Sequence, residues 1–562
     1  YSPSAVRACL ESTPFSENVR TNTLDYIKGM LTLDVFEENH KQSTGSVLDQ
    51  NVDVRARLDE METRVYTSDY AFQSEVSDLM WSLNDGHYYW TNCYDFFATA
   101  HGVPLVALST DATSTDRSSI YIAPDIWALA REYREIDPDF YRGLDTEEIA
   151  GARVVQIEGQ DAWDYLDGAA DRAGVYQDKQ QRLNSLFASP LVQYGGWDHD
   201  PGRFAVQRGF QNDSLRMTII ADLFPESGLQ VPWRTYWTSQ YRFTYDSGEE
   251  LSAEFGRRSG SSVSDERLGH IAKTTPPRQL PEINSFISAN SSSAQRTLYQ
   301  QCPSRTTLSV WPFGSSVDPT RDPSYLGGRD IQFFALDQER TGGVKTGVIY
   351  VTTFDPQPAT VTCFNRFILD VVIGLQNFTR SGVERILVDT SNNGGGYVYL
   401  SGILQLALAG GQYEPDLNFE VLFRKADLSE AAVQAYVDNP TEVQGYWNPI
   451  QFLDADANPL RASDNWMNPG VDFPVGSAVL SASNRVQFAT ENSFAQIEGV
   501  DPIPPFTSEE IIFTGNGLCG SACGGFTSFL AEYYNTTGFI STAQPGEPIT
   551  YTAFTSGNAV SS

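Results

Sequence analysis

Lysine is scarce in this chain of 562 residues, and long hydrophobic runs are missing. Only six lysines occur, and 71 acidic residues against 38 basic ones leave a net charge of −33. Such a surface repels phosphate backbones and anionic lipids, so we expect no nucleic acid and no membrane among the partners. A membrane-spanning helix needs roughly 18 or more apolar residues, and the best run, 367–375, is far shorter and contains Asp370. The sequence therefore predicts a soluble protein.

Cysteine is also rare, but the six cysteines form an even number, which fits a secreted chain with up to three disulfides of open pairing. The disulfide candidates are Cys9, Cys93, Cys302, Cys363, Cys519 and Cys523. Four sequons give N-glycosylation candidates at Asn212, Asn290, Asn377 and Asn535. The chain starts at Tyr1 with neither a methionine nor a signal sequence, which indicates a processed N-terminus. Together these features predict a secreted, extracellular glycoprotein.

The length predicts several domains, because a single core rarely grows beyond about 250–300 residues. Residues 1–100 have helical periodicity, 101–195 contain short strand-like runs, and 196–345 are β-rich. Residues 346–562 alternate strands with helices, which is typical of βαβ units and a mainly parallel sheet. The expected fold class is α/β in a multidomain α+β arrangement. A polar connector at 256–297 is expected to be exposed and sensitive to proteases.

A glycine-rich loop, Asp389-Thr-Ser-Asn-Asn-Gly-Gly-Gly-Tyr, follows a predicted strand in the last region. Consecutive glycines leave backbone N–H groups unobstructed, as an oxyanion hole requires, and another chain can approach them closely. The plain alternative is a tight turn between a strand and a helix. A phosphate-binding loop is disfavoured because no Gly-Lys-Ser/Thr follows.

A second loop, Gly515-Asn-Gly-Leu-Cys-Gly-Ser-Ala-Cys-Gly-Gly, precedes a helix predicted at 526–534. Ser521 in this loop is a candidate nucleophile, with amides and a helix dipole close by. The competing interpretation is a helix N-cap, a role that serine fills routinely. Cys519 and Cys523 are alternative nucleophiles or metal ligands, but a disulfide is favoured, and no second Cys/His pair supports zinc.

A nucleophilic serine needs a base. No lysine follows Lys425, which excludes a Ser–Lys dyad with the lysine in the next helix. The five histidines are the remaining candidates: His40, His87, His101, His199 and His270. His87 is favoured because it lies where a helical pattern stops at a glycine and an aromatic run begins.

Three segments taken together resemble the signatures of the S41 serine peptidases, the family of C-terminal processing proteases and the tricorn core. They are Leu83-Asn-Asp-Gly-His-Tyr, Ile386-Leu-Val-Asp-Thr-Ser-Asn-Asn-Gly-Gly-Gly, and the run from Thr514 through Gly-Leu-Cys-Gly-Ser-Ala-Cys. The likeness is greatest to secreted fungal S41 proteins related to the chlamydial protease-like activity factor. It implies a helical N-terminal region, a PDZ-like β-rich domain at 101–195 and a crotonase/ClpP-like core at 346–562.

By position, this resemblance implies that Ser521 is the nucleophile and His87 its general base. The oxyanion hole would combine the amide of Ala522 with that of Gly395 or Gly396. Relatives that use a Ser–His pair orient the imidazole with a glutamate well downstream of the serine. This chain has only Glu532 and Glu547 after Ser521, and neither fits that pattern. The third residue therefore stays open: the alternatives are a glutamate beyond Ser562, a different orienting residue, or an inactive enzyme.

Two functions from different classes follow. One is a secreted serine endopeptidase with a polypeptide substrate, no cofactor and no metal, for which a homodimer stays open. The other is a catalytically inactive S41-like protein that binds a peptide or an apolar ligand. Glycoside hydrolysis by paired carboxylates is disfavoured, because no local motif supports it.

Overall fold

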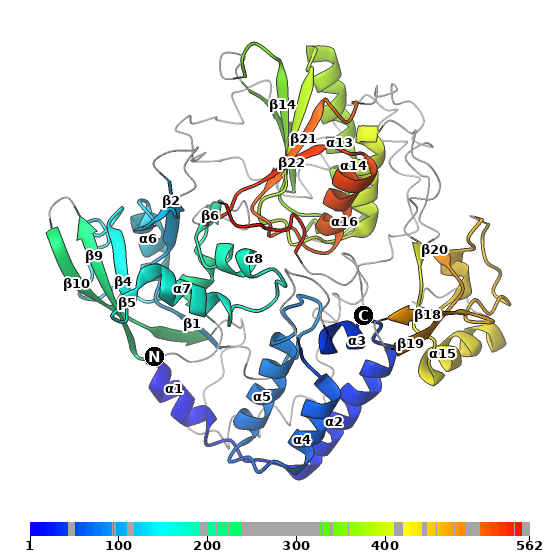
Figure 1. Cartoon of the computed structure of the whole chain (residues 1–562), viewed down its shortest axis with the longest axis horizontal. Helices are drawn as coiled ribbons and strands as arrows, with labels where there is room; N and C mark the ends of the chain where they lie inside the picture. Colours follow the sequence, from blue (N-terminus) through cyan, green and yellow to red (C-terminus); the bar gives the residue numbers. More distant parts are fainter. Residues whose placement is uncertain are drawn as a thin grey trace.

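The computed structural model describes most of the chain outside one long central stretch. The described residues are 1–42, 51–92, 94, 97–109, 117–190, 199–207, 212–221, 224–237, 326–327, 330–336, 341–357, 359–409, 420–440, 445, 447–456, 458–475, 478–488, 506–544 and 546–553. The predicted connector at 256–297, together with Cys93, Cys302, His270 and Asn290, lies outside them. Mixed α/β architecture, as predicted, is confirmed (Figure 1).

The N-terminal region is helical. Its helices are α1 (Pro3–Leu10), α2 (Glu17–Met30), η1 (Leu31–Leu33), α3 (Glu37–Lys41), α4 (Val54–Thr63) and α5 (Asp69–Trp81). Serine or aspartate begins four of them, because a side-chain oxygen at the N-cap accepts a backbone N–H of the first turn. Leu24, Leu58 and Phe72 are among the residues of the shared core. The loop after α5 carries His87.

The second domain is built on a sheet of strand order β10-β9-β4-β3-β2, with β5 (Gln160–Asp161) paired to β4. Its strands are β2 (Leu105–Leu108), β3 (Ser119–Ile122), β4 (Arg153–Ile157), β9 (Ser214–Ala221) and β10 (Phe224–Pro232). Its helices are α6 (Ile126–Ile136), α7 (Ala162–Ala170), α8 (Lys179–Asn184) and α9 (Gly202–Ala205). Beside them lie β1 (Phe97–Ala100), β6 (Ser189–Pro190), β7 (His199–Asp200), β8 (Val206–Gln207) and β11 (Arg234–Trp237). Figure 1 shows α8 between this sheet and the C-terminal core.

The C-terminal core contains a six-stranded sheet of order β12-β13-β14-β15-β21-β22. The pairs from β14 to β22 are parallel, and β12 and β13 are antiparallel additions. The strands are β12 (Leu326–Gly327), β13 (Ile331–Ala335), β14 (Thr346–Val351), β15 (Arg385–Asp389), β21 (Ile511–Gly515) and β22 (Thr537–Ile540). Helices α13 (Val361–Ser381), α14 (Val398–Ala409) and α16 (Ala522–Ser528) pack with the sheet around one apolar core. A π-helical turn, η6 (Phe529–Tyr533), continues α16.

A small module separates α14 from β21 in the sequence. It consists of β16 (Glu420–Val421), α15 (Asp427–Asp438), η4 (Pro449–Gln451), β17 (Phe452–Leu453), β18 (Val471–Val475), β19 (Ala478–Ala482) and β20 (Val486–Phe488). Trp466 and Phe452 lie in its own small core. Its Arg424 guanidinium donates to the Asp34 carbonyl, so the module is joined to the N-terminal region.

One predicted boundary is wrong. The helix expected at 526–534 begins at Ala522, directly after Ser521. Gly524 and Gly525 are poor helix formers, which is why the sequence pattern indicates a loop there. Ala522, Cys523 and Phe526 are buried in the core, and their packing outweighs that local preference.

Within the described ranges, no helix has both the length and the apolar character needed to cross a bilayer.

Candidate active site

The two candidate loops leave the same edge of the core sheet. Strands β15 and β21 are parallel neighbours, with Asp389 opposite Thr514, so the chain enters both loops side by side. The Gly520 N–H donates to the Asn393 carbonyl at 3.0 Å. A Cβ on Gly395 would lie 2.6 Å from the Ser521 Cβ and 2.5 Å from the Gly520 oxygen. Only glycine allows this approach, so the predicted nucleophile lies directly against the predicted oxyanion loop.

Ser521 does not behave as a helix cap. Its side chain accepts no hydrogen bond from the first turn of α16, although the residue occupies the N-cap position. Its backbone has φ 50° and ψ −124°, a conformation that a residue with a Cβ adopts at a cost of roughly 1–3 kcal/mol. The side chain is half-buried. The N-cap alternative is therefore not what the structure shows.

The three predicted oxyanion amides differ in what they already bond. The Gly395 N–H donates to the Asn393 side-chain oxygen at 2.9 Å. In the described part of the chain, neither the Gly396 nor the Ala522 N–H has a hydrogen-bond acceptor. The Ala522 nitrogen is 3.0 Å from the position a Gly395 Cβ would take, so it faces the glycine loop. Of the three predicted oxyanion amides, the Gly395 N–H is thus the one already bonded within the described residues.

His87 lies on the loop after α5, in the N-terminal region. Its Nδ1 is 3.3 Å from an oxygen of Asp85, and its backbone N–H donates to the same oxygen at 2.9 Å. Asp85 is 2% exposed and the His87 side chain 21% exposed. The Tyr88 hydroxyl donates to Asp34, which fixes the loop against η1 and α3. Sequence reasoning missed Asp85, although it stands two residues before His87 in the Asp-Gly-His motif.

No hydrogen bond joins Ser521 to His87 among the described residues. Ser521, the candidate nucleophile, belongs to the C-terminal core, and His87, the candidate base, belongs to the N-terminal region. Their pairing stays a prediction. The two downstream glutamates are exposed, and neither is bonded to His87 in the described ranges. Glu532 instead accepts a hydrogen bond from the Tyr551 hydroxyl.

The cysteines support the predicted oxidised state in part. Cys519 and Cys523 form a disulfide that brackets Ser521, and Cys363 is disulfide-bonded as well. Cys9 is a free thiol, which differs from its prediction as a disulfide candidate. Asn212, Asn377 and Asn535 are exposed, as a glycan acceptor must be. Among the described residues, no cluster of three or more His, Cys, Asp and Glu side chains could hold a metal.

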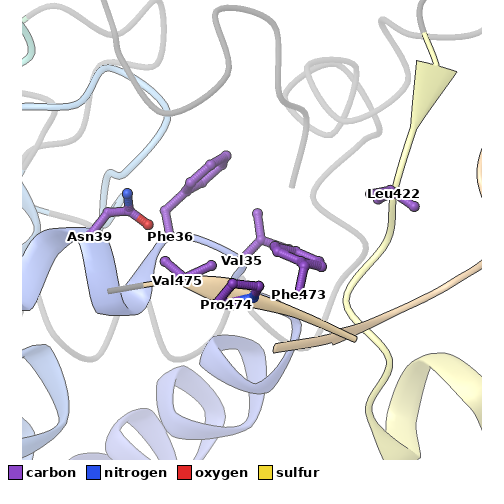
Figure 2. Close-up of a pocket in the computed structure, with 7 residues that line it drawn as sticks. All are labelled: Val35, Phe36, Asn39, Leu422, Phe473, Pro474 and Val475. Atoms are coloured by element: carbon purple, nitrogen blue, oxygen red, sulfur yellow. The ribbon is translucent and has the colours of Figure 1, made fainter. Parts of the chain in front are cut away.

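An apolar pocket of about 560 Å³ lies elsewhere, between the N-terminal region and the small module. Figure 2 shows its walls, with Phe36 and Asn39 on one side and residues of β18 on the other. The lining residues are Val35, Phe36, Asn39, Leu422, Phe473, Pro474 and Val475. None of them belongs to the two loops around Ser521.

Comparison with known proteins identifies one domain. The sequence model of the CPAF-like PDZ domain matches residues 98–220. The chain carries a CPAF-like PDZ domain. The match extends past the end of the PDZ-like region predicted at 101–195 and includes all but the last residue of β9. From here on we call residues 98–220 the PDZ domain.

The chain is also similar to two curated proteins of Diaporthe leptostromiformis. They are the peptidase S41 family proteins phomP1′, 28% identical, and phomP1, 27% identical, each over 180 residues. The alignment covers 31% of this chain and 24% of each relative, so it spans about a quarter of the relatives' length. The predicted resemblance to S41 peptidases of the CPAF type is confirmed.

Among solved structures, the chain is similar to mature CPAF complexed with lactacystin, with 13% identity and a TM-score of 0.42 over 95% of this chain and 88% of that one. It is also similar to the photosystem II D1 C-terminal processing protease, with 11% identity and a TM-score of 0.25 over 94% and 80% of the two chains.

Proposed function

We propose that this protein is a secreted serine endopeptidase of the S41 type, with Ser521 as the nucleophile and His87 as the general base. The observation that carries the proposal is the close approach of Gly395 to Ser521. It places a strained serine that caps no helix against the glycine loop. Within the described ranges, the Ala522 and Gly396 N–H groups of these two loops have no acceptor. A structural turn needs neither the strain nor the open amides.

In the proposed reaction, the Ser521 Oγ attacks the carbonyl carbon of the scissile peptide while His87 takes the hydroxyl proton. The carbonyl oxygen becomes negatively charged and accepts hydrogen bonds from the Ala522 and Gly396 N–H groups. As the tetrahedral intermediate collapses, the C–N bond breaks and His87 returns the proton to the leaving amine. Water then attacks the acyl-enzyme by the same route, which frees the second product and restores Ser521.

In this proposal, Asp85 takes the role of the orienting carboxylate beside His87. Its carboxylate faces Nδ1 of His87, so it favours the tautomer whose Nε2 accepts the serine proton, and it stabilises the imidazolium that forms. The loop that holds both residues is fixed by Tyr88 and Asp34. His87 has to approach Ser521 for the reaction, and such bonds often form only once substrate is bound.

Secretion is part of the same proposal. The disulfide at Cys519–Cys523 and the exposed sequons at Asn212, Asn377 and Asn535 support an oxidising, glycosylating route. Expression in a secreting eukaryotic host should give protein that loses mass on treatment with an N-glycosidase. An unchanged mass would remove the support that the sequons provide.

Labelling with a fluorophosphonate tests the catalytic proposal. The folded, oxidised protein should gain one adduct on the peptide that contains Ser521, and Ser521→Ala should abolish it. Ser528→Ala, a serine of the same helix, is the matched control and should label normally. Failure of the natural protein to label while it is folded would overturn the proposal.

The apolar pocket favours a second candidate, an inactive S41-like protein that binds an apolar ligand there. In that case Ser521 stays unlabelled, whereas a neutral apolar dye such as Nile red gains fluorescence with the protein. Val475→Asp should weaken that signal by placing a charge in the pocket wall. Dye binding that is unaffected by this substitution would argue against the pocket as the site.

A further inference from the structure

Asn516 joins the two loops of the candidate active site. Its side-chain oxygen accepts the Asn392 N–H at 3.1 Å and the Leu518 N–H at 3.2 Å. Its side-chain nitrogen donates to the Asn392 side-chain oxygen at 2.7 Å. One amide group therefore holds the start of the glycine loop and the start of the serine loop together. Asn392 lies three residues before Gly395, and Asn516 five residues before Ser521.

The PDZ domain contributes to the same network from the other side. The Asn184 side-chain nitrogen, at the end of α8, donates to the Asn516 carbonyl at 2.9 Å. The Ser189 hydroxyl of β6 donates to the Asn392 side-chain oxygen at 2.9 Å. The Gln181 side chain packs against Gly517, where an added Cβ would lie 3.1 Å from its Cγ. Each loop is thus bonded to the PDZ domain as well as to the other loop.

An amide side chain at 516 suits the network. Its oxygen accepts from two backbone N–H groups while its nitrogen, a separate atom, donates to the Asn392 side chain. Asn392 has φ 59°, a left-handed backbone that asparagine tolerates better than most residues. The bonds to Asn516 hold Asn392 in that conformation, and the chain reaches Gly395 and Gly396 from there.

We propose that Asn516 is a positioning residue that sets the distance between the oxyanion amides and Ser521, and that the PDZ domain stabilises this setting through Asn184 and Ser189. The inference rests on the proposed peptidase function. Because the oxyanion bonds strengthen in the transition state, an error in that distance lowers kcat more than it raises KM. The hydrogen bonds of Asn184 and Ser189 thus connect the PDZ domain directly to the two loops of the candidate active site.

The test compares Asn516→Ala, Ser189→Ala and the control Asn458→Ala with the natural full-length protein. Asn458 bonds to Asp454 in the small module and should have no effect. Fluorophosphonate titration counts competent sites, and kcat is expressed per titrated site. We expect Asn516→Ala to lower kcat about 10- to 100-fold with less than about a threefold change in KM, and Ser189→Ala to lower kcat a few-fold.

The outcomes separate this inference from the proposed function. If the natural protein fails to label, the peptidase proposal fails first. If it labels and Asn516→Ala keeps the natural kcat per titrated site, the positioning role is overturned and the network is only structural. If Asn516→Ala does not fold, Ser189→Ala decides, because it removes a single hydroxyl. An unchanged kcat in that variant overturns the contribution of the PDZ domain.

Discussion

The two halves of the proposed machinery are held in different ways. On the nucleophile side, Ser521, the glycine loop and Asn516 are joined by short hydrogen bonds and by the approach of Gly395. On the base side, His87 is fixed to Asp85 and its loop to Asp34, all within the N-terminal region. The contrast teaches that the oxyanion site is assembled within the core, whereas the base comes from a separate domain.

Removing the base should have the largest effect. We expect His87→Ala to lower kcat on the order of 10⁴-fold, because the serine proton then has no general base to accept it. The half-buried His87 contributes little packing, so the melting temperature should stay close to that of the natural protein. Steady-state kinetics with a peptide substrate measure the first quantity and thermal unfolding the second. Natural activity in His87→Ala would remove His87 from the mechanism.

Neutralising Asp85 tests the base side without deleting the histidine. Asp85→Asn keeps an oxygen for the His87 N–H but loses the charge that stabilises the imidazolium. We expect kcat to fall on the order of 10²-fold, with KM nearly unchanged. If kcat in Asp85→Asn stays within about twofold of the natural value, Asp85 serves only the backbone turn and another group orients His87.

Two glycines of the same loop, Gly394 and Gly396, test the nucleophile side. A Cβ on Gly396 would overlap the Phe354 carbonyl, and its φ is 136°, so Gly396→Ala should destabilise folding by more than about 2 kcal/mol. A Cβ on Gly394 meets nothing within 4 Å, so Gly394→Ala should be neutral or slightly stabilising. Unfolding by denaturant measures the free energy of unfolding of both variants. Equal values for Gly396→Ala and Gly394→Ala would show that the loop is less tightly packed than the structure indicates.

A buried histidine of the PDZ domain should affect the stability of the fold in a pH-dependent way. His101 packs against Phe204 and Trp233, and burial lowers its pKa to about 3. The unfolded chain takes up a proton near pH 6.5 and the folded chain does not. Stability is therefore lost as the pH falls from about 6.5 toward 3, by up to about 1.4 kcal/mol per pH unit. His101→Asn, which keeps an acceptor for Val103, should flatten this part of the pH–stability curve. An unchanged slope would contradict the assignment.

The regular elements of the core could be predicted closely from the sequence. Strands and helices alternate over 346–409 as predicted, and the strand predicted before the glycine loop is β15, since apolar periodicity and composition fix such elements. The start of α16 could not be predicted, because tertiary packing overrides the poor helix propensity of its glycines. The local sequence pattern contains no information about this tertiary packing.

Ser521 lies against the glycine loop, but the catalytic roles of these residues stay predictions. Sequence alone offered Gly395 and Gly396 equally, and the choice depends on the Asn393 side chain that occupies the Gly395 N–H. The carboxylate beside His87 is that of Asp85, which belongs to the Asp-Gly-His motif itself. Contacts across domains, such as Asn184 with Asn516, leave no periodic signal in the chain.

More than 430 residues of chain lie between His87 and Ser521. At synthesis rates of about 5–20 residues per second, the first leaves the ribosome roughly 20–90 s before the second. During that interval the growing polypeptide contains His87 but not yet Ser521. In the proposed mechanism, the catalytic pair is therefore complete only after the chain has been synthesised as far as Ser521.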